Sequence, residues 1–525
     1  MKIKFIKEIF IIALIFVMAG CSAKSQDSGK NSGGHDQVGE ELRVAIPASP
    51  PGLDSHVSAS QNIADVGRHV FETLVTIDSN FNVKPMLAES WSESEDGKTI
   101  TFNLRKGILF HNGKEMVADD IVASLERWFE VSSLGSENFS DASLEAKDDY
   151  TVELKLPTPQ STALSTLAYG GGNYASIMPK EIIESAGDEA VKEYVGTGPF
   201  NFEEWKQDQY IHLVKFDDYQ PIEEQADGLA GKKEALVEGI HFLIVPDSST
   251  RIAGIQTGEY DIAIDVNYDS VDQLKSNPDV ELSNNPYGIY NIFYNKSNGI
   301  FKDIRAREAV ALALDKKGLL LAAFSSEENY LFDHSMMMNY QAGLWSSDAG
   351  KEEYYLEPDI EKAKKLLEEA GYNGEEITIL TSKDQDFLYN GSIVLQQQLE
   401  KLGLNAKVDV YDWPTYLDKR SEKTGFDILL GTSTPKLDPT SMAFLREDFV
   451  GWTDSPELPG LIKEFKTAPS LEEAKLIFND LQEWFYEYKP VTKVGDFSKI
   501  HAIRSNVSGY KYLDGPIIWN VSNNE

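Results

Sequence analysis

The only cysteine of the 525-residue chain, Cys21, directly follows an apolar run at residues 9–19, and this placement strongly constrains the fold. A sole cysteine excludes an intramolecular disulfide framework and a cysteine-rich zinc site, so the folded part must rely on packing. The apolar run follows a head with three lysines. It is long enough for the core of a signal peptide but too short to span a bilayer as a helix. Residues 1–20 are therefore expected to be a leader.

The residues Met18-Ala19-Gly20-Cys21 resemble the lipobox at which bacterial lipoproteins are lipidated on cysteine and then cleaved before it. The resemblance implies a lipid on Cys21 and a protein anchored at the extracytoplasmic face of the cell membrane. A free cysteine after an ordinary signal peptide is the alternative. Residues 21–41 are rich in Ser, Gly and charged side chains and lack apolar periodicity, which predicts a flexible tether.

The composition limits the classes of molecule that this protein can bind. The formal net charge is -36, and an acidic surface of this size repels phosphate, so nucleic-acid binding is not expected. Hydrophobic residues make up 41% of the chain, which is typical of a folded protein rather than a disordered one. The length favours roughly two to four domains.

Strand and helix patterns are mixed along the chain, which predicts an α/β fold. Apolar or alternating segments predict strands, and 3.6-residue periodicity predicts helices. No repeat of 20–50 residues is present, so a solenoid or propeller is not expected. The predicted strands are 42–46, 99–104, 150–156, 210–216, 239–245, 290–294, 377–381, 406–410 and 426–430. The predicted helices are 62–74, 117–129, 249–258, 304–314, 359–370 and 392–402.

Signals for catalysis are absent from the sequence. The eight histidines form no HExxH motif and no i, i+4 pair in a helical stretch, so neither a metal site nor a cofactor is expected. Gly196-Thr197-Gly198-Pro199-Phe200 lacks the lysine and the following helix of a phosphate loop. It is expected to be a structural turn whose glycines supply positive φ. With no nucleophile–base pair in view, the sequence predicts a protein that is not an enzyme.

Several motifs in order along the chain resemble the family 5 extracellular solute-binding proteins, which are substrate receptors of peptide- and nickel-type ATP-binding-cassette (ABC) importers. The resemblance runs from about residue 42 to the C-terminus. The segments that carry it are 87–91 (LAESW), 96–107 (DGKTITFNLRKG), 110–113 (FHNG), 118–125, 196–200 (GTGPF), 246–251, 258–261 (GEYD), 305–310, 315–316 and 363–372.

The resemblance implies a two-lobed, periplasmic-binding-protein-like fold of class II, with an extra domain inserted in the first lobe and a ligand enclosed between the lobes. The expected boundaries are 42–76, 191–289 and 496–525 for the first lobe, 77–190 for the extra domain and 290–495 for the second lobe. The expected function is capture of a peptide or peptide-like solute and its delivery to the permease and ATPase subunits of an importer. A monomer is expected.

The resemblance also implies where a ligand is held. In peptide-binding relatives an aspartate after the strand at 426–430 pairs with the α-ammonium of the ligand, and here Pro435 takes that position. Asp438, which matches the acidic residue of the family's Asp/Glu-Pro step, is either a ligand-binding residue or a turn residue before Pro439. A buried ammonium without a carboxylate is costly. The ligand amine is therefore blocked or displaced, or another acid substitutes.

The other candidate ligand-binding residues are less specific. Aromatic residues in the cleft-lining segment can stack on a ligand or merely pack, and the glycine-rich segment 169–173 can offer backbone N–H groups or be a loop. Lys383 lies near the position of a carboxylate-binding base in dipeptide binders. These further candidates are Trp413, Tyr416, Thr432, Ser433, Thr434, Lys383, Tyr169 and Asn173.

Two alternatives stay open. A receptor for nickel or a metal chelate belongs to the same family, and its metal would arrive already chelated because the scattered histidines offer no preformed site. A surface protein without a transport role could also reuse the fold.

Overall fold

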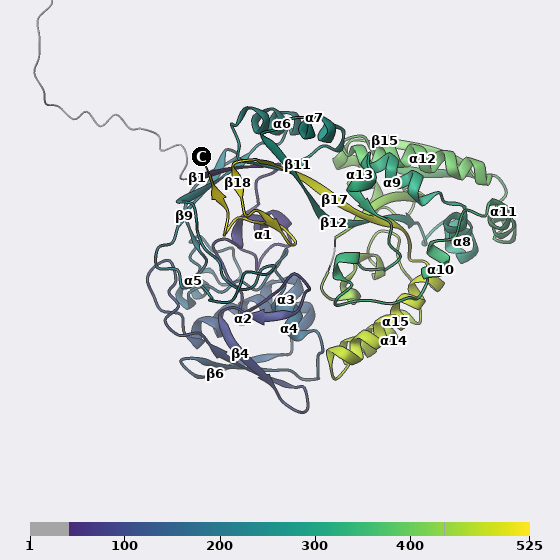
Figure 1. The fold of residues 1–525 in the computed structure, drawn as a ribbon. Helices are drawn as coiled ribbons and strands as arrows, with labels where there is room; N and C mark the ends of the chain where they lie inside the picture. The colour runs from purple at the N-terminus through teal and green to yellow at the C-terminus, as the bar shows by residue number, and fades with distance from the viewer. Residues whose placement is uncertain (1–40, 435, 525) are drawn as a thin grey trace, which may run out of the picture. The chain divides into compact units, whose positions relative to one another are not determined.

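The computed structural model describes residues 41–434 and 436–524, so the predicted leader, the tether before Glu41, Cys21 and Pro435 lie outside the described residues. Its largest sheet has eleven strands within that part of the chain and the main order β15-β14-β16-β12-β17-β11-β1-β10-β9-β8 (Figure 1). The strands at one end, called here the first lobe, are β1 (Glu41–Ile46), β8 (Phe200–Lys206), β9 (Tyr210–Lys215), β10 (Gly239–Ile244) and β11 (Ile262–Val266). The strands at the other end, the second lobe, are β14 (Glu376–Ser382), β15 (Asn405–Tyr411) and β16 (Ile428–Ser433).

Two long strands join these ends. β12 (Val280–Tyr294) and β17 (Val491–Arg504) pair with each other in antiparallel fashion from Val280–Arg504 to Phe293–Val491. One half of β17 also pairs with β11 of the first lobe, and one half of β12 pairs with β16 of the second. Each strand therefore belongs to both lobes, and the short β13 (Tyr330–Leu331) adds to β17.

A separate sheet of four strands lies in the segment between β3 and β8. Its order is β4-β5-β7-β6, and helix α2 packs on β6 and β7. We call this part the inserted domain. Its elements are β4 (Ala88–Glu93), β5 (Thr99–Leu104), α2 (Ala118–Val131), α3 (Ser133–Phe139), β6 (Ser143–Asp148), β7 (Thr151–Lys155), α4 (Ala163–Leu167) and α5 (Lys180–Ala186).

The remaining helices cover the large sheet. Those of the first lobe are α1 (Gln61–Gly67), α6 (Ser248–Thr257) and α7 (Val271–Lys275). Those of the second lobe are α8 (Ile304–Ala313), α9 (Lys316–Phe324), α10 (Lys351–Tyr354), α11 (Ile360–Glu369), α12 (Asp386–Leu402), α13 (Trp413–Ser421), α14 (Leu458–Lys466) and α15 (Leu471–Tyr488). Short strand pairs complete the fold: β2 (Val75–Ile77) with β3 (Val83–Pro85), β18 (Val507–Ser508) with β21 (Ser522–Asn523), and β19 (Lys511–Tyr512) with β20 (Pro516–Ile517).

Helix α1 ends at Gly67, seven residues before the end of the predicted helix 62–74. The carbonyl oxygens of His69 and Val70 accept hydrogen bonds from the backbone N–H groups of Phe200 and Gly198 instead of from helical neighbours. The apolar periodicity therefore continues through a turn that packs on segment 196–200, since tertiary contacts can override a local pattern.

That segment is a structural turn, as the sequence predicts, but the reason given for its glycines is wrong. Neither Gly196 nor Gly198 has positive φ. A Cβ on Gly196 would lie 2.1 Å from the carbonyl oxygen of Val70, and one on Gly198 would lie 2.5 Å from that of His69. Close approach of two backbones, not left-handed backbone, therefore requires glycine here.

Other element boundaries also differ from the prediction. Helix α12 begins at Asp386 rather than at residue 392, and it passes through Gly391, where a Cβ would lie 2.2 Å from the Tyr290 hydroxyl. Strand β16 begins two residues later than predicted and extends to Ser433. Strand β12 is ten residues longer than the predicted segment 290–294.

His69 generates a prediction about acid stability. It is fully buried; its Nδ1 bonds to the Val66 carbonyl oxygen at 3.1 Å, and its Nε2 accepts from the Ile518 N–H at 3.1 Å, so the neutral ring fits the site. Burial lowers its pKa to about 3, and burial also lowers the pKa of His56 to about 4 and that of His501 to about 3. The unfolded chain binds protons at these rings from its ordinary pKa of about 6.5, so stability falls as the pH drops from there toward 4.

Between pH 6.5 and 4.5 we expect the free energy of unfolding of His69→Gln to fall less steeply than that of the native protein. The difference in slope should be up to about 1.4 kcal/mol per pH unit. Denaturant unfolding at pH 7.5, 6.5, 5.5 and 4.5 measures the difference, and the two slopes should coincide above pH 7. Equal slopes between pH 6.5 and 4.5 would contradict the assignment of a neutral His69.

Candidate functional site

A cleft of about 440 Å³ lies where the two lobes meet at β12 and β17. The first lobe supplies the loop after β11, the second lobe supplies the first turn of α12 and the start of α13, and the two long strands supply its floor. Its lining includes Arg251, Asp265, Asp269, Tyr287, Asp384, Asp386, Phe387, Trp413, Thr432, Phe497 and Lys499. We call it the interlobe cleft.

The cations of the interlobe cleft are held by the protein itself. Lys499 Nζ lies 2.6 Å from Asp265 Oδ2 and 4.0 Å from the centre of the Tyr287 ring. Burial raises the pKa of Asp265, but the nearby Lys499 ammonium outweighs this effect and the net pKa is lowered. The Arg251 guanidinium donates to the carbonyl oxygens of Ile264, Val245, Pro246 and Asp265. Lys499 is therefore paired with Asp265, and Arg251 has most of its donors bonded to backbone oxygens.

The carboxylates of the cleft are different. Asp269 Oδ1 accepts from the Ser325 hydroxyl at 3.1 Å, Asp384 Oδ2 accepts from the Trp413 N–H at 2.7 Å, and Asp386 lies in the first turn of α12. Within residues 41–434 and 436–524, none of these three forms an ion pair. The cleft therefore presents negative charge and favours a cationic or ammonium-bearing ligand.

A second cavity, of about 240 Å³, separates the inserted domain from segment 436–446 of the second lobe. Its lining includes Tyr169, Asn173, Lys436 and Asp438, and we call it the Asp438 cavity. The Lys436 Nζ lies 5.9 Å from the centre of the Tyr169 ring. Burial lowers the pKa of Lys436.

Asp438 is 6% exposed, and its two carboxylate oxygens have different environments. Oδ1 accepts from the Thr440 N–H at 2.7 Å and from the Thr440 hydroxyl at 2.6 Å, which caps the short helix η5 (Pro439–Ser441). Oδ2 is buried and has no hydrogen-bond partner among the described residues. Burial raises the pKa of this carboxyl. Asp438 can thus cap this turn through Oδ1 and still offer Oδ2 to a ligand.

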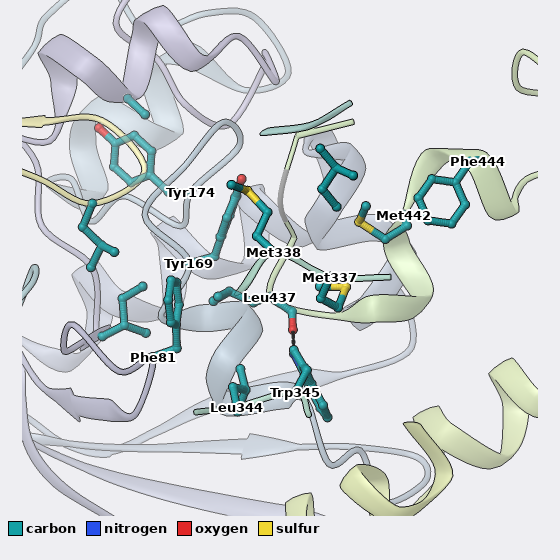
Figure 2. Packing of buried hydrophobic residues seen from close by; sticks show 14 of the residues in the cluster. Phe81, Tyr169, Tyr174, Met337, Met338, Leu344, Trp345, Leu437, Met442 and Phe444 are labelled. Atoms are coloured by element: carbon teal, nitrogen blue, oxygen red, sulfur yellow. Dashed lines mark hydrogen bonds between the residues drawn. The ribbon is translucent and has the colours of Figure 1, made fainter. Parts of the chain in front are cut away.

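Apolar packing joins the lobes beside this cavity. Figure 2 shows Tyr169 and Phe81 near Met338, Leu437 and Trp345 of the second lobe, with the Trp345 indole N–H donating to the Leu437 carbonyl oxygen at 2.6 Å. Phe81 lies 5.1 Å from the ring of Tyr340. An ion pair from Lys466 of α14 to Glu137 of α3, at 3.2 Å, adds a polar contact.

The predicted site residues divide between these places. Trp413 and Thr432 line the interlobe cleft, and Tyr169, Asn173 and Asp438 line the Asp438 cavity. The Asn173 amide is already used: Oδ1 accepts from the Ser133 hydroxyl at 2.8 Å, and Nδ2 donates to the Ser55 carbonyl oxygen at 3.0 Å.

The other candidates lie around the two cavities. Tyr416 is 1% exposed and stacks on Trp413 with ring centres 5.1 Å apart, so it supports the residue that lines the cleft. The Ser433 hydroxyl is buried and accepts from the Asn291 amide at 3.0 Å, whereas Thr434 is exposed at the end of β16. Lys383 is exposed in the turn between β14 and α12 and is absent from both linings.

Sequence reasoning missed the floor and one wall of the interlobe cleft. Tyr287, Phe497 and Lys499 come from β12 and β17, which are separated by about two hundred residues, and Asp269 comes from a loop with no motif. No local signal marked Lys499, because its strand also carries Lys493, Asp496, His501 and Arg504.

Comparisons with known proteins agree with this architecture. Residues 82–450 match the model of the bacterial extracellular solute-binding proteins, family 5. The chain is 29% identical to a probable peptide ABC transporter periplasmic-binding protein of Sinorhizobium fredii, with 86% of this chain and 88% of that protein covered. It is 26% identical to the oligopeptide-binding protein AppA of Bacillus subtilis, with 98% and 97% covered.

The fold is also that of solved structures. The crystal structure of the ABC transporter substrate-binding protein CtaP from Listeria monocytogenes superposes with a TM-score of 0.76 at 22% identity, covering 90% of this chain and 95% of that one. No helix in the described part of the chain is both long and apolar enough to cross a membrane. The matched motifs, the two-lobed fold and the cleft between the lobes agree: the chain belongs to family 5 of the bacterial extracellular solute-binding proteins.

Proposed function

We propose that this protein captures a peptide or peptide-like solute between its lobes and delivers it to the permease of an ABC importer, without catalysing a reaction. The observation that carries the proposal is the Asp438 carboxylate, which is buried, lines a cavity between the lobes and leaves Oδ2 without a partner among the described residues. The relatives named as peptide-binding proteins support the same ligand class.

The chemistry of Asp438 favours an ammonium group. A buried, unpaired carboxylate is unfavourable, and a ligand cation that donates to Oδ2 would remove this cost. Pro435 stands where peptide-binding relatives have the ammonium-binding aspartate, so Asp438, three residues later, is the acid that substitutes for it. Lys436 lines the same cavity but does not pair with Oδ2, which has no hydrogen-bond partner among the described residues.

The interlobe cleft also suits the size and character of a short peptide. Ligand sites commonly have volumes of about 300–1,000 Å³ and combine apolar walls with a few polar groups. The interlobe cleft, of about 440 Å³, has the aromatic rings of Tyr287, Phe387, Trp413 and Phe497 beside its carboxylates. Rings of this kind contact ligand side chains without demanding one sequence.

A nickel or metal-chelate receptor is the alternative within the family. No histidine or cysteine is among the residues that line the interlobe cleft or the Asp438 cavity, so an ion would depend on its chelator for ligands. A surface protein without a transport role is the remaining alternative. The binding test below separates these readings.

We expect Asp438→Asn to weaken binding of a peptide with a free α-ammonium by about tenfold or more, since it removes the charge but keeps an acceptor for Thr440. The ligand released from the purified protein is first identified by mass spectrometry. Calorimetric titration then measures the affinity of both proteins for that peptide, for trialanine and for N-acetyl-trialanine. The native protein should bind trialanine more tightly than the variant does, whereas both should bind N-acetyl-trialanine equally, because it has no α-ammonium.

Asp359→Asn is the matched control, because Asp359 also caps a helix of the second lobe, α11, but on the exposed surface. It should bind as the native protein does. Equal binding by both variants would overturn the role of Asp438. If no peptide raises the melting temperature while a nickel–histidine chelate does, the metal-chelate alternative is correct.

Lipid anchoring at Cys21 is part of the same proposal and rests on the sequence, because Cys21 lies outside the described residues. We expect Cys21→Ser to move the protein from the membrane fraction to the soluble fraction, and mass spectrometry of the N-terminal peptide to show a diacylglyceryl group only in the native protein. Ser22→Ala is the control and should stay in the membrane fraction. Equal partition of native protein and Cys21→Ser would exclude the anchor.

A further inference from the structure

Two histidines and a glutamate lie together on three neighbouring strands of the first lobe. His212 of β9 and His241 of β10 are direct cross-strand partners, and Glu41, which opens β1, is the register partner of Gly239. Register partners point to the same face of a sheet, and so do residues two apart along one strand. Glu41, His212 and His241 therefore share one face, and we call them the Glu41 cluster.

The geometry of the Glu41 cluster brings three metal-binding atoms to one point. His212 Nε2 lies 3.3 Å from Glu41 Oε1, and His241 Nε2 lies 2.7 Å from Glu41 Oε2. The two imidazole rings are stacked, with centres 4.0 Å apart and planes 5° from parallel, so both Nε2 atoms face the same carboxylate. One ligand atom from each residue lies within 4.8 Å of the other two.

These separations suit a first-row transition metal. Zinc binds imidazole nitrogen at about 2.0–2.1 Å in tetrahedral geometry, which places neighbouring ligand atoms about 3.3 Å apart. The His212–Glu41 separation already has that value, and the His241–Glu41 separation is shorter. Because the two ring planes are nearly parallel, their Nε2 lone pairs run side by side, so the rings must turn toward each other to share one ion. Two imidazoles and one carboxylate are a common protein ligand set for zinc, with the fourth position left to water.

Gly239 is consistent with the assignment. Its φ is not in the left-handed region. A Cβ at this position would lie 2.9 Å from Glu41 Oε1, 2.9 Å from the Leu213 carbonyl oxygen and 3.1 Å from His212 Nε2, so the Glu41 cluster and strand β9 both limit the space there. The missing side chain therefore leaves the space in which the polar atoms of the Glu41 cluster meet.

The surroundings add polar support and access. Glu204 of β8 is the register partner of His212 on the other side and accepts from the Tyr210 hydroxyl at 2.6 Å. The Tyr210 ring packs edge-on against His241 at 5.5 Å. The three side chains of the cluster retain between 17% and 39% of their exposure, which lets an ion enter from solvent.

We infer that Glu41, His212 and His241 bind one divalent transition-metal ion, of the zinc type, on the first lobe. The site is separate from ligand capture, because none of its residues lines the interlobe cleft or the Asp438 cavity. A bound ion would link β1, β9 and β10 and stabilise this end of the large sheet. Binding requires a free lone pair on each Nε2, so a proton must shift to Nδ1 or leave the ring.

The test is calorimetric titration of the metal-stripped full chain with zinc chloride, with the melting temperature recorded alongside. We expect one zinc ion per chain and a rise in melting temperature. His212→Gln, His241→Gln and Glu41→Gln should each weaken zinc binding by roughly tenfold or more. His334→Gln is the control, since this histidine lies in the second lobe with its Nε2 bonded to the Ser347 carbonyl oxygen, and it should bind as the native protein does.

Two further measurements keep the inference testable if a ligand variant folds poorly. Gly239→Ala keeps all three ligands but crowds their meeting point and the Leu213 carbonyl oxygen, so it should weaken zinc binding, and circular dichroism measures whether the sheet stays folded. Cobalt added in place of zinc should give the visible absorption of a site with nitrogen ligands, and His212→Gln should abolish it. Equal zinc affinity of the native protein, His212→Gln and Gly239→Ala, or no zinc binding at all, would overturn the inference.

Discussion

The continuous pairing of β12 with β17 is the interaction on which the rest of the structure depends. The two strands carry the hydrogen-bond ladder from the first lobe into the second, so each wall of the interlobe cleft is positioned relative to them. The ladder shifts register between Pro286 and Gly288 and again between Tyr290 and Asn291. Pro286 cannot donate to the ladder, and register shifts weaken and bend a strand pair. The cleft thus lies beside an irregular part of this strand pair.

A buried charged residue also stabilises the part of β17 that joins the two lobes. Lys493 of β17 is 2% exposed; its Nζ lies 2.6 Å from Asp496 and donates to the carbonyl oxygens of Ser335 at 2.6 Å and Met337 at 2.9 Å. This network fastens segment 335–338, which packs between the lobes in Figure 2, to the strand that joins them. Removing one partner of a buried ion pair destabilises a protein far more than removing one partner of an exposed pair. The strand pair β12–β17 and the packing of segment 335–338 are therefore coupled through Lys493.

The sequence predicted much of the fold because its signals are local. Strands such as β1 and β10 and helices such as α6 and α11 end at or just before a glycine or proline, and α11 is also strongly amphipathic, so their predicted ranges agree closely with the structure. The failures are tertiary: α1 stops where the carbonyl groups of His69 and Val70 bond to another segment, and Gly391 marks contact with Tyr290 rather than a helix boundary. The long strand β17 was not predicted at all.

The site was harder to predict from the sequence for the same reason, because tertiary contacts bring its residues together. Asp438 and Trp413 were indicated by the family motifs, but Tyr287, Lys499 and Asp269 meet only because distant strands pair. The Glu41 cluster shows this most clearly. His212 and His241 are 29 positions apart, with no helical spacing, and only the antiparallel register makes them neighbours. A cross-strand metal site leaves no i, i+4 signature in a sequence.

The sign of the charge in the cleft follows from hydrogen bonding rather than from composition. Three buried arginines, Arg68, Arg251 and Arg307, donate to backbone carbonyl oxygens and thereby hold loops in place. Their donors are consequently used by the scaffold, and of the three only Arg251 lines the interlobe cleft, whereas Asp269, Asp384 and Asp386 line it without an ion pair among the described residues. A chain with net charge -36 has many acids on its surface, where salt screens them within about 10 Å. These three exposed carboxylates at the edge of the interlobe cleft, and not the total charge, give the cleft its negative sign.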